Sequence, residues 1–382
     1  MTSPIDARMI YLDYNATTPL APCVQEGILP FLAEHYGNPS SGHALGKAAH
    51  AAVDDARVRV AQLLGASSDE ILFTSGGTES NNLALKGHFD ASGAERRHLV
   101  ISAFEHPAVA APARYLERRG ATVSTVGCDA RGVVNPADVA AAIQPDTFLV
   151  SIMLANNEIG TIQPLRAMAE ICRERGVILH SDAAQAVGKI PINVSQLGVD
   201  LLTVAGHKFY APKGVGALYV RRGVHLEPLL HGAGHEAGLR AGTENVAQIV
   251  GLGVAAEFAS RHLDASQSRL ATLRERLWSQ LLESIPEITW NGAGAALLPN
   301  TLSVNFPRVR GSALLARLPD ICASTGAACH SGETSLSATQ RALGLSPQIA
   351  EGTVRLSLGL YNDEEEIDRA ANQIIAAWEA LR

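Results

Sequence analysis

Apolar runs alternate with amphipathic stretches through most of the first 220 residues. Helical spacing of apolar residues fills most gaps between the runs, for example in Ala108–Arg119 and Leu165–Arg175. This alternation is typical of a parallel sheet covered by helices on both faces, so the chain is predicted to be an α/β protein. The apolar runs predict a mostly parallel seven-stranded sheet with these strands: Ile71–Thr74, Leu99–Ser102, Thr122–Val126, Phe148–Leu154, Val177–Ser181, Leu201–Ala205 and Val215–Val220.

The pattern changes after a long predicted helical region that ends near Ser284. From there, short strands and helices predict a smaller α+β domain, which includes Thr301–Phe306, Ser312–Leu318, Val354–Leu358 and a last helix from Asp363. We place the large domain at residues 15–258 and the small domain at residues 1–14 and 259–382. Near the N-terminus, Tyr36–Gly46 predicts a turn-rich loop before a helix over Lys47–Leu64.

Composition excludes several classes of protein. The 382 residues are 47% hydrophobic, which allows a large core, and the net charge of −7 comes without a basic stripe, so nucleic acid is not an expected partner. No apolar run approaches the roughly 20 residues of a membrane span, and the N-terminus does not resemble a signal peptide. Five widely spaced cysteines form no C-x-x-C pair, so we predict no metal site and a cytoplasmic protein with reduced thiols.

Candidate chemistry gathers just past the predicted strands, where ligands bind in such sheets. Lys208 follows Leu201–Ala205 and precedes another apolar strand. Burial lowers the pKa of a lysine, and a neutral amine can form a Schiff base with a carbonyl cofactor. The alternative is a structural lysine that extends to solvent from the end of a strand.

Four other strand ends carry polar residues, and each has a structural alternative. Gly76-Gly77-Thr78 opens a helix and suits a phosphate, although such glycines can serve turn geometry alone. His106 precedes a helix and is a ring-stacking or a capping histidine. Asn156-Asn157 can orient a ligand or form an Asx turn, and Asp182 can pair with a protonated pyridine or in an ion pair. Together these residues supply the anion site, amine and carboxylate that pyridoxal 5'-phosphate requires.

The ordered motifs YLDYNATTP, YGNPSSGHALG, ILFTSGGTESNNLALKG, EHPAV, NNEIGTIQP, HSDAAQAVGKIPI, GHKFYAPKGVGALYVRRG, RAGTENV and VRLSLG extend over nearly the whole chain. In these motifs the chain resembles the cysteine desulfurases of the class V aminotransferase group, which have the pyridoxal-phosphate fold of type I. The resemblance implies that Lys208 forms the Schiff base and that the cofactor is otherwise held by Gly77, Thr78 and His207 at the phosphate, His106 on the ring, Asp182 at the pyridine nitrogen, Gln185 at the ring oxygen and Asn157 beside it.

The resemblance also implies contacts beyond the cofactor. Arg355 would bind the carboxylate of L-cysteine, with Asn15 and Asn157 beside the substrate. Thr243 would reach the phosphate of the other subunit, which implies a homodimer. One departure is Ala205, where the family often has a serine, so the anion site loses one hydroxyl.

A loop of small residues carries Cys329, which aligns with the nucleophile of the family. The resemblance implies three catalytic residues, Cys329, Lys208 and His106, and the products alanine and a Cys329 persulfide for a sulfur-acceptor protein. His330 would lower the pKa of the thiol when charged. The alternative is a packed thiol, which is our expectation for Cys322.

Three alternatives remain open for the activity. The sequence GAACHSG resembles the corresponding loop of selenocysteine lyases. GHKFY and the missing serine fit the same enzymes, so L-selenocysteine is a second candidate substrate. Another class V enzyme would not need Cys329, and a non-enzymatic protein with the same fold would not need Lys208. Because the chain ends at Arg382, directly after a predicted helix, we do not expect docking to an iron–sulfur scaffold through a longer tail.

Overall fold

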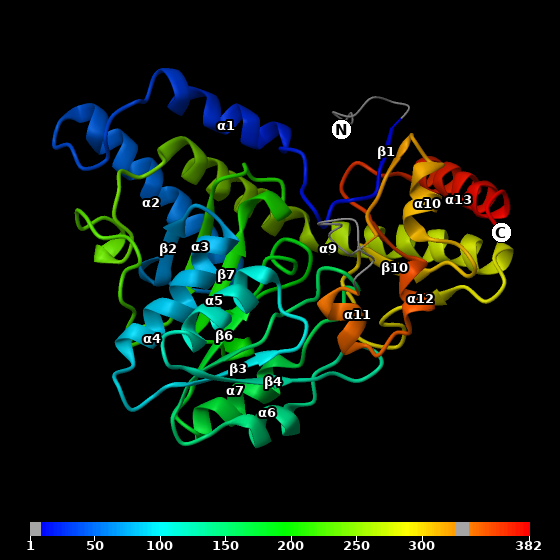
Figure 1. Ribbon diagram of the computed structural model, residues 1–382. Helices are drawn as coiled ribbons and strands as arrows, with labels where there is room; N and C mark the ends of the chain where they lie inside the picture. The colour runs from blue at the N-terminus through cyan, green and yellow to red at the C-terminus, as the bar shows by residue number, and fades with distance from the viewer. Residues whose placement is uncertain (1–8, 326–335) are drawn as a thin grey trace.

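The computed structural model describes residues 9–325 and 336–382, which form two lobes joined by the long helix α9 (Val246–Ser284) (Figure 1). The larger lobe contains a seven-stranded sheet in the order β2-β8-β7-β6-β5-β3-β4. Within the described chain, β8 alone runs antiparallel to its neighbours, which confirms the predicted mostly parallel sheet. The strands are β2 (Ile71–Thr74), β3 (His98–Ser102), β4 (Thr122–Val126), β5 (Thr147–Ser151), β6 (Ile178–Asp182), β7 (Leu201–Ala205) and β8 (Gly216–Val220).

Both faces of this sheet are buried because successive residues of its strands are apolar. On β7, Leu202 and Val204 belong to one apolar cluster, whereas Leu201 belongs to another on the opposite face. The first cluster includes residues of α1 (Pro22–Ala33), α2 (Ala44–Leu64), α6 (Pro136–Ala142), α7 (Leu165–Glu174), α8 (Val194–Leu197) and α9. The second includes residues of α4 (His88–Ala91), α5 (Pro107–Glu117) and a π-helical turn, Leu83–Gly87, which follows α3 (Gly77–Asn82).

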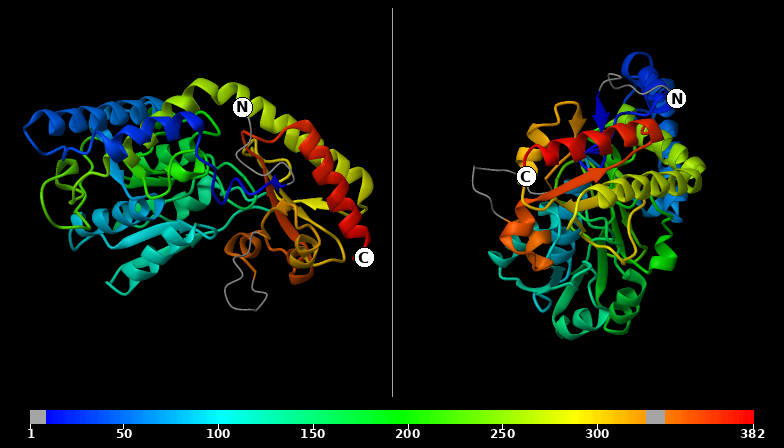
Figure 2. Two further views of the ribbon diagram at one scale, coloured as in Figure 1. Left: turned by 90° about the horizontal axis from the view of Figure 1, so that it is seen from above. Right: turned by 90° about the vertical axis from the view of Figure 1, so that its right-hand side faces the viewer.

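The smaller lobe is built on an antiparallel sheet in which β10 (Thr301–Asn305) lies between β9 (Thr289–Trp290) and β12 (Thr353–Ser357). Figure 2 shows α13 (Glu364–Glu379) alongside the second half of α9, and the two helices are in contact. A parallel pair, β1 (Ile10–Tyr11) and β11 (Ile321–Cys322), adds the N-terminal segment to this lobe. Its short helices are α10 (Gly311–Ala316), α11 (Ala338–Ala342) and α12 (Pro347–Glu351).

Helix α9 contributes to two apolar cores. Its first half buries small residues such as Ala255 and Ala256 in the larger lobe. Its second half buries Leu270, Leu273 and Leu277 in the core of the smaller lobe. We keep the domain boundary at residue 258 as a proposal that agrees with this change of core.

Most element boundaries agree with the sequence prediction to within two residues, and two differ by three. Helix α2 begins at Ala44, inside the predicted loop, because the ring of His43 accepts a hydrogen bond from the Gly46 N–H at 3.3 Å and caps the helix. Strand β5 ends at Ser151 rather than Leu154, where the chain stays buried but leaves the ladder. None of the helices in residues 9–325 and 336–382 combines the length and hydrophobicity needed to span a bilayer.

Candidate active site

The carboxyl ends of β2, β3, β5, β6 and β7 meet at one edge of the sheet because these strands run in the same direction. A cavity of about 340 Å³ opens at this edge, and ten of the predicted site residues line it. Those ten are Asn15, Gly77, Thr78, His106, Asn157, Asp182, Gln185, His207, Lys208 and Arg355. Residues separated by up to 340 positions in the chain therefore share one site, at the place where parallel sheets bind ligands.

Lys208 lies in the loop that joins β7 to β8, and its side chain is half-buried. Its Nζ donates hydrogen bonds to the backbone oxygens of Asn15 at 2.7 Å and Ala16 at 2.8 Å. Tyr210, with φ of 70°, turns the loop, and its N–H donates to Thr18 Oγ1 at 2.8 Å. The N-terminal segment thus holds the lysine within the cavity rather than letting it extend to solvent.

The electrostatics of the cavity favour the neutral amine of Lys208. Burial lowers the pKa of Lys208 to about 8, and the positive charge of Arg355 acts in the same direction. The carboxylates of Asp182 and Asp13 oppose this shift. Near neutral pH an appreciable fraction of the side chain is therefore an unprotonated nucleophile.

Asp182 closes β6 with a buried carboxylate that is 6% exposed. Its Oδ2 accepts a hydrogen bond from Asn81 Nδ2 at 2.7 Å, and its Oδ1 accepts one from the Ala184 N–H at 3.0 Å. Among the described residues, no ion pair forms on this carboxylate. Two neutral donors hold its position while its charge remains available to a cation in the cavity.

The start of α3 forms the anion-binding end of the cavity. Gly77 and Thr78 line it, and the first N–H groups of a helix have no partner within the helix. Gly76 adopts φ of 143°, and a Cβ at Gly216 would lie 2.7 Å from the Gly76 Cα. The close packing of these two glycines therefore fixes the turn that presents the backbone of Gly77 and Thr78.

His207 and Ala205 lie on the other side of this end. Burial and, to a lesser extent, the charge of Lys208 together lower the pKa of His207 to about 4, so the imidazole is neutral. The His207 Nδ1 is 3.1 Å from Thr17 Oγ1. A Cβ built on Gly77 would lie 3.2 Å from the Ala205 Cβ, so Ala205 presents an apolar methyl group beside the helix start.

His106 has the capping role that the sequence allows, and its position also leaves the predicted ring-stacking role open. It is the N-cap of α5, where its Nδ1 accepts a hydrogen bond from the Ala108 N–H at 3.1 Å, and it lines the cavity. The surrounding protein displaces water from the ring and lowers its pKa, and Lys208 adds to this effect while Asp182 opposes it. A neutral imidazole fixed at a helix start is suited to stacking, and because Nδ1 accepts the Ala108 N–H, Nε2 carries the ring proton.

Glu105, next to His106, is a buried carboxyl group that the sequence did not single out. Its Oε1 accepts hydrogen bonds from Ser102 Oγ at 2.5 Å and from the Met153 N–H at 2.9 Å. Burial raises the pKa of Glu105 to about 8, and its Oε2 has no partner in the described chain. The group is therefore mostly protonated at neutral pH and joins the ends of β3 and β5.

Arg355 reaches the cavity from β12 of the smaller lobe. Its guanidinium donates to the backbone oxygen of Asn157 at 2.9 Å and to Asp13 Oδ1 at 2.6 Å. Its Nε is buried and has no partner in the described chain. A carboxylate ligand would find a fixed guanidinium with donor capacity to spare.

Among the described residues that the resemblance assigns to the site, Thr243 alone does not line the cavity. This residue is exposed. Cys329 and His330 lie outside the described residues. The chain that leads toward them is anchored at Ser324, whose backbone exchanges hydrogen bonds with that of Arg355 at 2.7 and 3.3 Å.

Sequence reasoning also missed Asn81 and Asp13. Asn81 follows Thr78 by three residues, so helical spacing places both on one face of α3 and was a usable signal. Asp13 pairs with Arg355, 342 positions away, and no local pattern indicates that pairing.

Asn156, in the segment that follows β5, forms the Asx turn that the sequence allowed. Its Oδ1 accepts hydrogen bonds from the N–H groups of Glu158 and Ile159 at 2.8 and 3.0 Å.

Known proteins share this architecture. The cysteine desulfurase IscS of Dictyoglomus turgidum is 44% identical over 377 residues, which cover 98% of this chain and 96% of that protein. A solved NifS-like protein is 40% identical with a TM-score of 0.92, and the match covers 98% of this chain and 100% of that one. A solved structure of SspA in complex with cysteine is 36% identical with a TM-score of 0.82 over 92% of this chain and 99% of that one.

The profile of the family described as aminotransferase class-V matches residues 10–370. That range includes both lobes and every residue that lines the cavity. The chain belongs to the aminotransferase class-V family, whose members depend on pyridoxal phosphate.

Proposed function

We propose that the chain is a cysteine desulfurase that uses pyridoxal 5'-phosphate to convert L-cysteine into L-alanine and a persulfide on Cys329. The observation that carries the proposal is the amine of Lys208, which has a lowered pKa and lies in one cavity with Asp182 and the start of α3. The IscS relative at 44% identity has this activity by name, and SspA has been solved with cysteine bound.

The donor set of the cavity fits the cofactor. Lys208 offers an amine for the aldehyde, Asp182 offers a carboxylate without a cationic partner, and the first N–H groups of α3 suit a phosphate. When bound, pyridoxal phosphate supplies an electron sink that stabilises negative charge at the substrate α-carbon. Because Ala205 is apolar, the phosphate would depend on backbone N–H groups, Thr78 and His207.

The remaining side chains would bind the substrate and orient the cofactor ring. Arg355 would hold the substrate carboxylate with its guanidinium, beside Asn15 and Asn157. His106 would stack on the cofactor ring and help to move protons, because its imidazole lines the cavity. Gln185 would donate to the ring oxygen, and the Lys208 amine would move a proton at the substrate carbon.

Cys329 would accept the sulfur. Its thiolate attacks the substrate sulfur, an S–S bond forms, and the C–S bond breaks with its electron pair left on carbon. The carbon takes up a proton and leaves as alanine, while the persulfide is available to a sulfur-acceptor protein. Cys329 comes five positions after Ser324 in the sequence, a span of at most about 18 Å from Ser324, whose backbone is bonded to that of Arg355.

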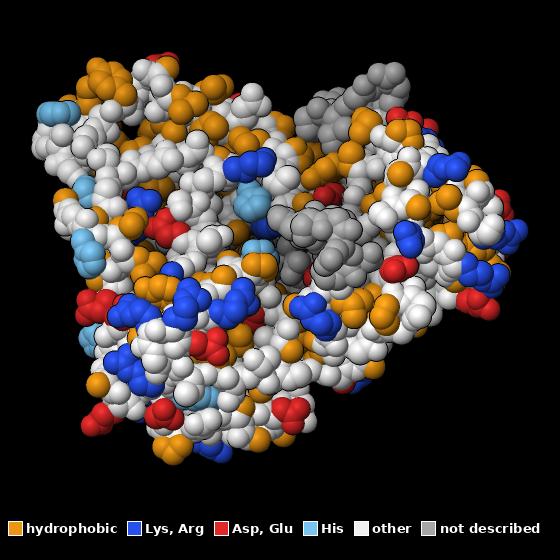
Figure 3. All heavy atoms as spheres, in the orientation of Figure 1, with side chains coloured by type: hydrophobic (Ala, Val, Ile, Leu, Met, Phe, Trp, Pro, Cys, Tyr) orange, Lys and Arg blue, Asp and Glu red, His pale blue; other side chains and the backbone are white. Residues whose placement is uncertain are grey.

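An apolar surface supports the homodimer. Figure 3 shows hydrophobic side chains gathered over α1 and the segment that joins it to α2. There Leu29, Leu32 and Tyr36 are 53%, 60% and 74% exposed. Such a group of exposed large apolar side chains is typical of an interaction surface. With Thr243 also exposed, we propose that a second copy covers this surface and receives Thr243 at its phosphate site.

Product analysis tests the assignment. Protein loaded with pyridoxal phosphate is supplied with L-cysteine or L-selenocysteine, and alanine is measured for wild type, Cys329→Ala and the control Cys322→Ala. We expect alanine from L-cysteine with wild type and the control, and its loss in Cys329→Ala. Alanine from L-selenocysteine alone would assign a selenocysteine lyase instead. Full turnover of L-cysteine by Cys329→Ala would indicate another class V activity.

A further inference from the structure

Lys189 is a buried lysine in the turn that follows β6, next to residues that line the cavity. It is 8% exposed, and it is not among the residues that line the cavity. Its Nζ donates to Asn15 Oδ1 and to Gln185 Oε1, each at 2.8 Å. Burial lowers the pKa of Lys189 well below its usual range, and the charges of Lys208 and Arg355 add to this effect.

The hydrogen bonds of Lys189 suit a neutral amine. A neutral amine has two N–H groups, and the structure provides two acceptors for them. Both acceptors are uncharged amide oxygens, which do not offset the cost of a buried cation. Lys189 therefore serves as a fixed pair of neutral donors.

This pair of donors determines the orientation of the Gln185 amide. Gln185 Oε1 accepts from Lys189, and its Nε2 donates to the backbone oxygen of Asn15 at 2.9 Å. A flipped amide would place Oε1 against the Asn15 oxygen, two acceptors in contact, and would leave Lys189 facing an NH₂ group. Since Nε2 carries two N–H groups, one remains for the cavity that Gln185 lines.

We propose that Lys189 is a positioning residue that makes Gln185 present an N–H donor, rather than a carbonyl oxygen, to the phenolic oxygen of pyridoxal phosphate. The inference rests on the proposed function. A donor at that oxygen favours its anionic form, whereas an acceptor there disfavours it. Lys189 thereby favours the anionic form of the cofactor's phenolic oxygen without contacting the cofactor.

The test is a pH titration of the visible absorption band of the loaded protein for wild type, Lys189→Met, Gln185→Ala and the double variant. Methionine approximates the length of lysine and has no N–H donor. We expect the pH midpoint of the band to rise by about one unit in Lys189→Met, which is the loss of one hydrogen bond to a charged group. In the double variant we expect no rise beyond that of Gln185→Ala, because Lys189 acts through the Gln185 amide.

Three controls distinguish a general effect of losing a lysine, a folding defect and a failure to bind the cofactor. Lys47→Met, at an exposed position of α2, should keep the wild-type midpoint. If Lys189→Met does not fold, Lys189→Leu also lacks a donor and replaces it with the same expected rise. A wild-type midpoint in the folded Lys189 variant would overturn this inference alone, as would additive shifts in the double variant. A wild-type protein that takes up no cofactor would overturn the proposed function and the inference with it.

Discussion

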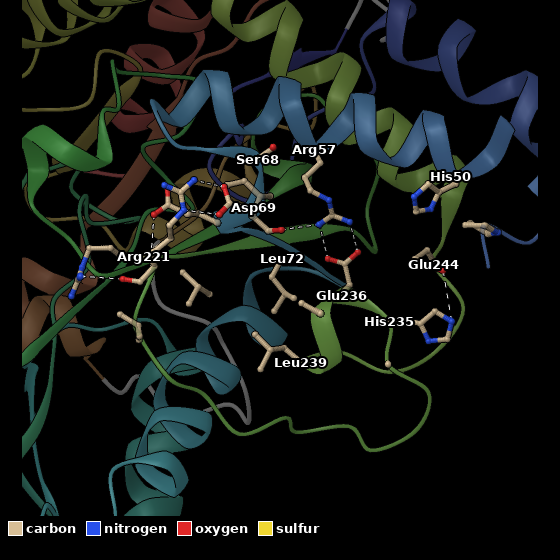
Figure 4. A pocket seen from close by; sticks show the side chains of 18 of the residues that line it. His50, Arg57, Ser68, Asp69, Leu72, Arg221, His235, Glu236, Leu239 and Glu244 are labelled. Carbon is tan, nitrogen blue, oxygen red and sulfur yellow. Dashed lines mark hydrogen bonds and ion pairs between the residues drawn. The ribbon is translucent and has the colours of Figure 1, made fainter. Parts of the chain in front are cut away.

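Two cavities of the molecule, one beside α2 and one at the candidate active site, differ in how their charged side chains are paired. The cavity beside α2 has a volume of about 760 Å³, more than twice that of the candidate active site at about 340 Å³. In the larger cavity the charged side chains pair with one another, as Arg57 does with both carboxylate oxygens of Glu236 at 2.7 Å (Figure 4). In the smaller cavity, Lys208 donates to backbone oxygens and Asp182 accepts from neutral N–H groups.

The volume of a cavity therefore does not identify the reactive site. Paired charges satisfy each other and stabilise the fold, whereas an amine and a carboxylate held apart by neutral partners keep their reactivity. Burial, with the charge of Arg355 acting in the same direction, lowers the pKa of Lys208 to about 8, and no carboxylate in the described chain pairs directly with the amine to reverse this shift. Substitutions in the two cavities should therefore affect different measurements.

Lys208→Ala should have the largest effect on activity. We expect alanine formation from L-cysteine to fall by at least about a thousandfold, because the only amine that can capture the cofactor in this loop position is lost. The midpoint of thermal unfolding should stay close to that of wild type, since a buried lysine contributes little stability. Lys213→Ala, an exposed position in the same loop, is the matched control and should retain activity. Normal turnover by Lys208→Ala would show that Lys208 is not the reactive amine.

Glu236→Ala should have the largest effect on stability. The Glu236 side chain is 3% exposed and pairs with Arg57, and it also accepts a hydrogen bond from the Phe73 N–H at 2.8 Å. Its removal leaves a partly buried guanidinium unpaired, so we expect denaturant unfolding to show a loss of about 3 to 5 kcal/mol. Arg222→Ala, which breaks an exposed pair with Asp69, should change stability little. Equal losses in both variants would contradict the distinction between buried and exposed pairs.

Arg355→Lys should have a smaller effect, confined to substrate binding. Lysine keeps the charge but cannot form the planar fork that a guanidinium offers a carboxylate. We expect kcat/KM for L-cysteine to fall roughly tenfold to a hundredfold, mainly through KM, as for the loss of one charged hydrogen bond. Steady-state kinetics measures this split. An unchanged KM together with a reduced kcat would place Arg355 in the chemical step instead.

Much of the fold could be predicted because apolar runs record burial directly. All seven strands of the large sheet were expected, and the run Leu201–Ala205 matches β7 at both ends. Residues past the strand ends were also predictable, since parallel topology brings them to one edge. The bonds between them were not, because partners such as Arg355 and Asp13 lie 342 positions apart in the chain and are brought together only by tertiary packing. Glu105 was missed for a related reason: its burial depends on how β3 and β5 are placed.

Glu105→Gln gives the smallest and most discriminating effect, because Glu105 and Glu236 are both buried glutamates with opposite surroundings. Glu236 faces a guanidinium, whereas Glu105 receives a hydroxyl and a backbone N–H. Burial raises the folded-state pKa of Glu105 from 4.5 to about 8, so its contribution to stability is complete below pH 4.5 and is lost as the pH rises through about 8.

Glutamine stays uncharged at every pH and can still accept both hydrogen bonds. Relative to wild type, the unfolding free energy of Glu105→Gln should therefore rise by about 1 kcal/mol between pH 6 and pH 7 and level off above pH 8. Denaturant unfolding across this range measures the difference, with Glu117→Gln at the exposed end of α5 as the control. A constant difference from pH 5 to pH 9 would mean that Glu105 is charged throughout, and the contrast between an unpaired and a paired buried glutamate would then fail.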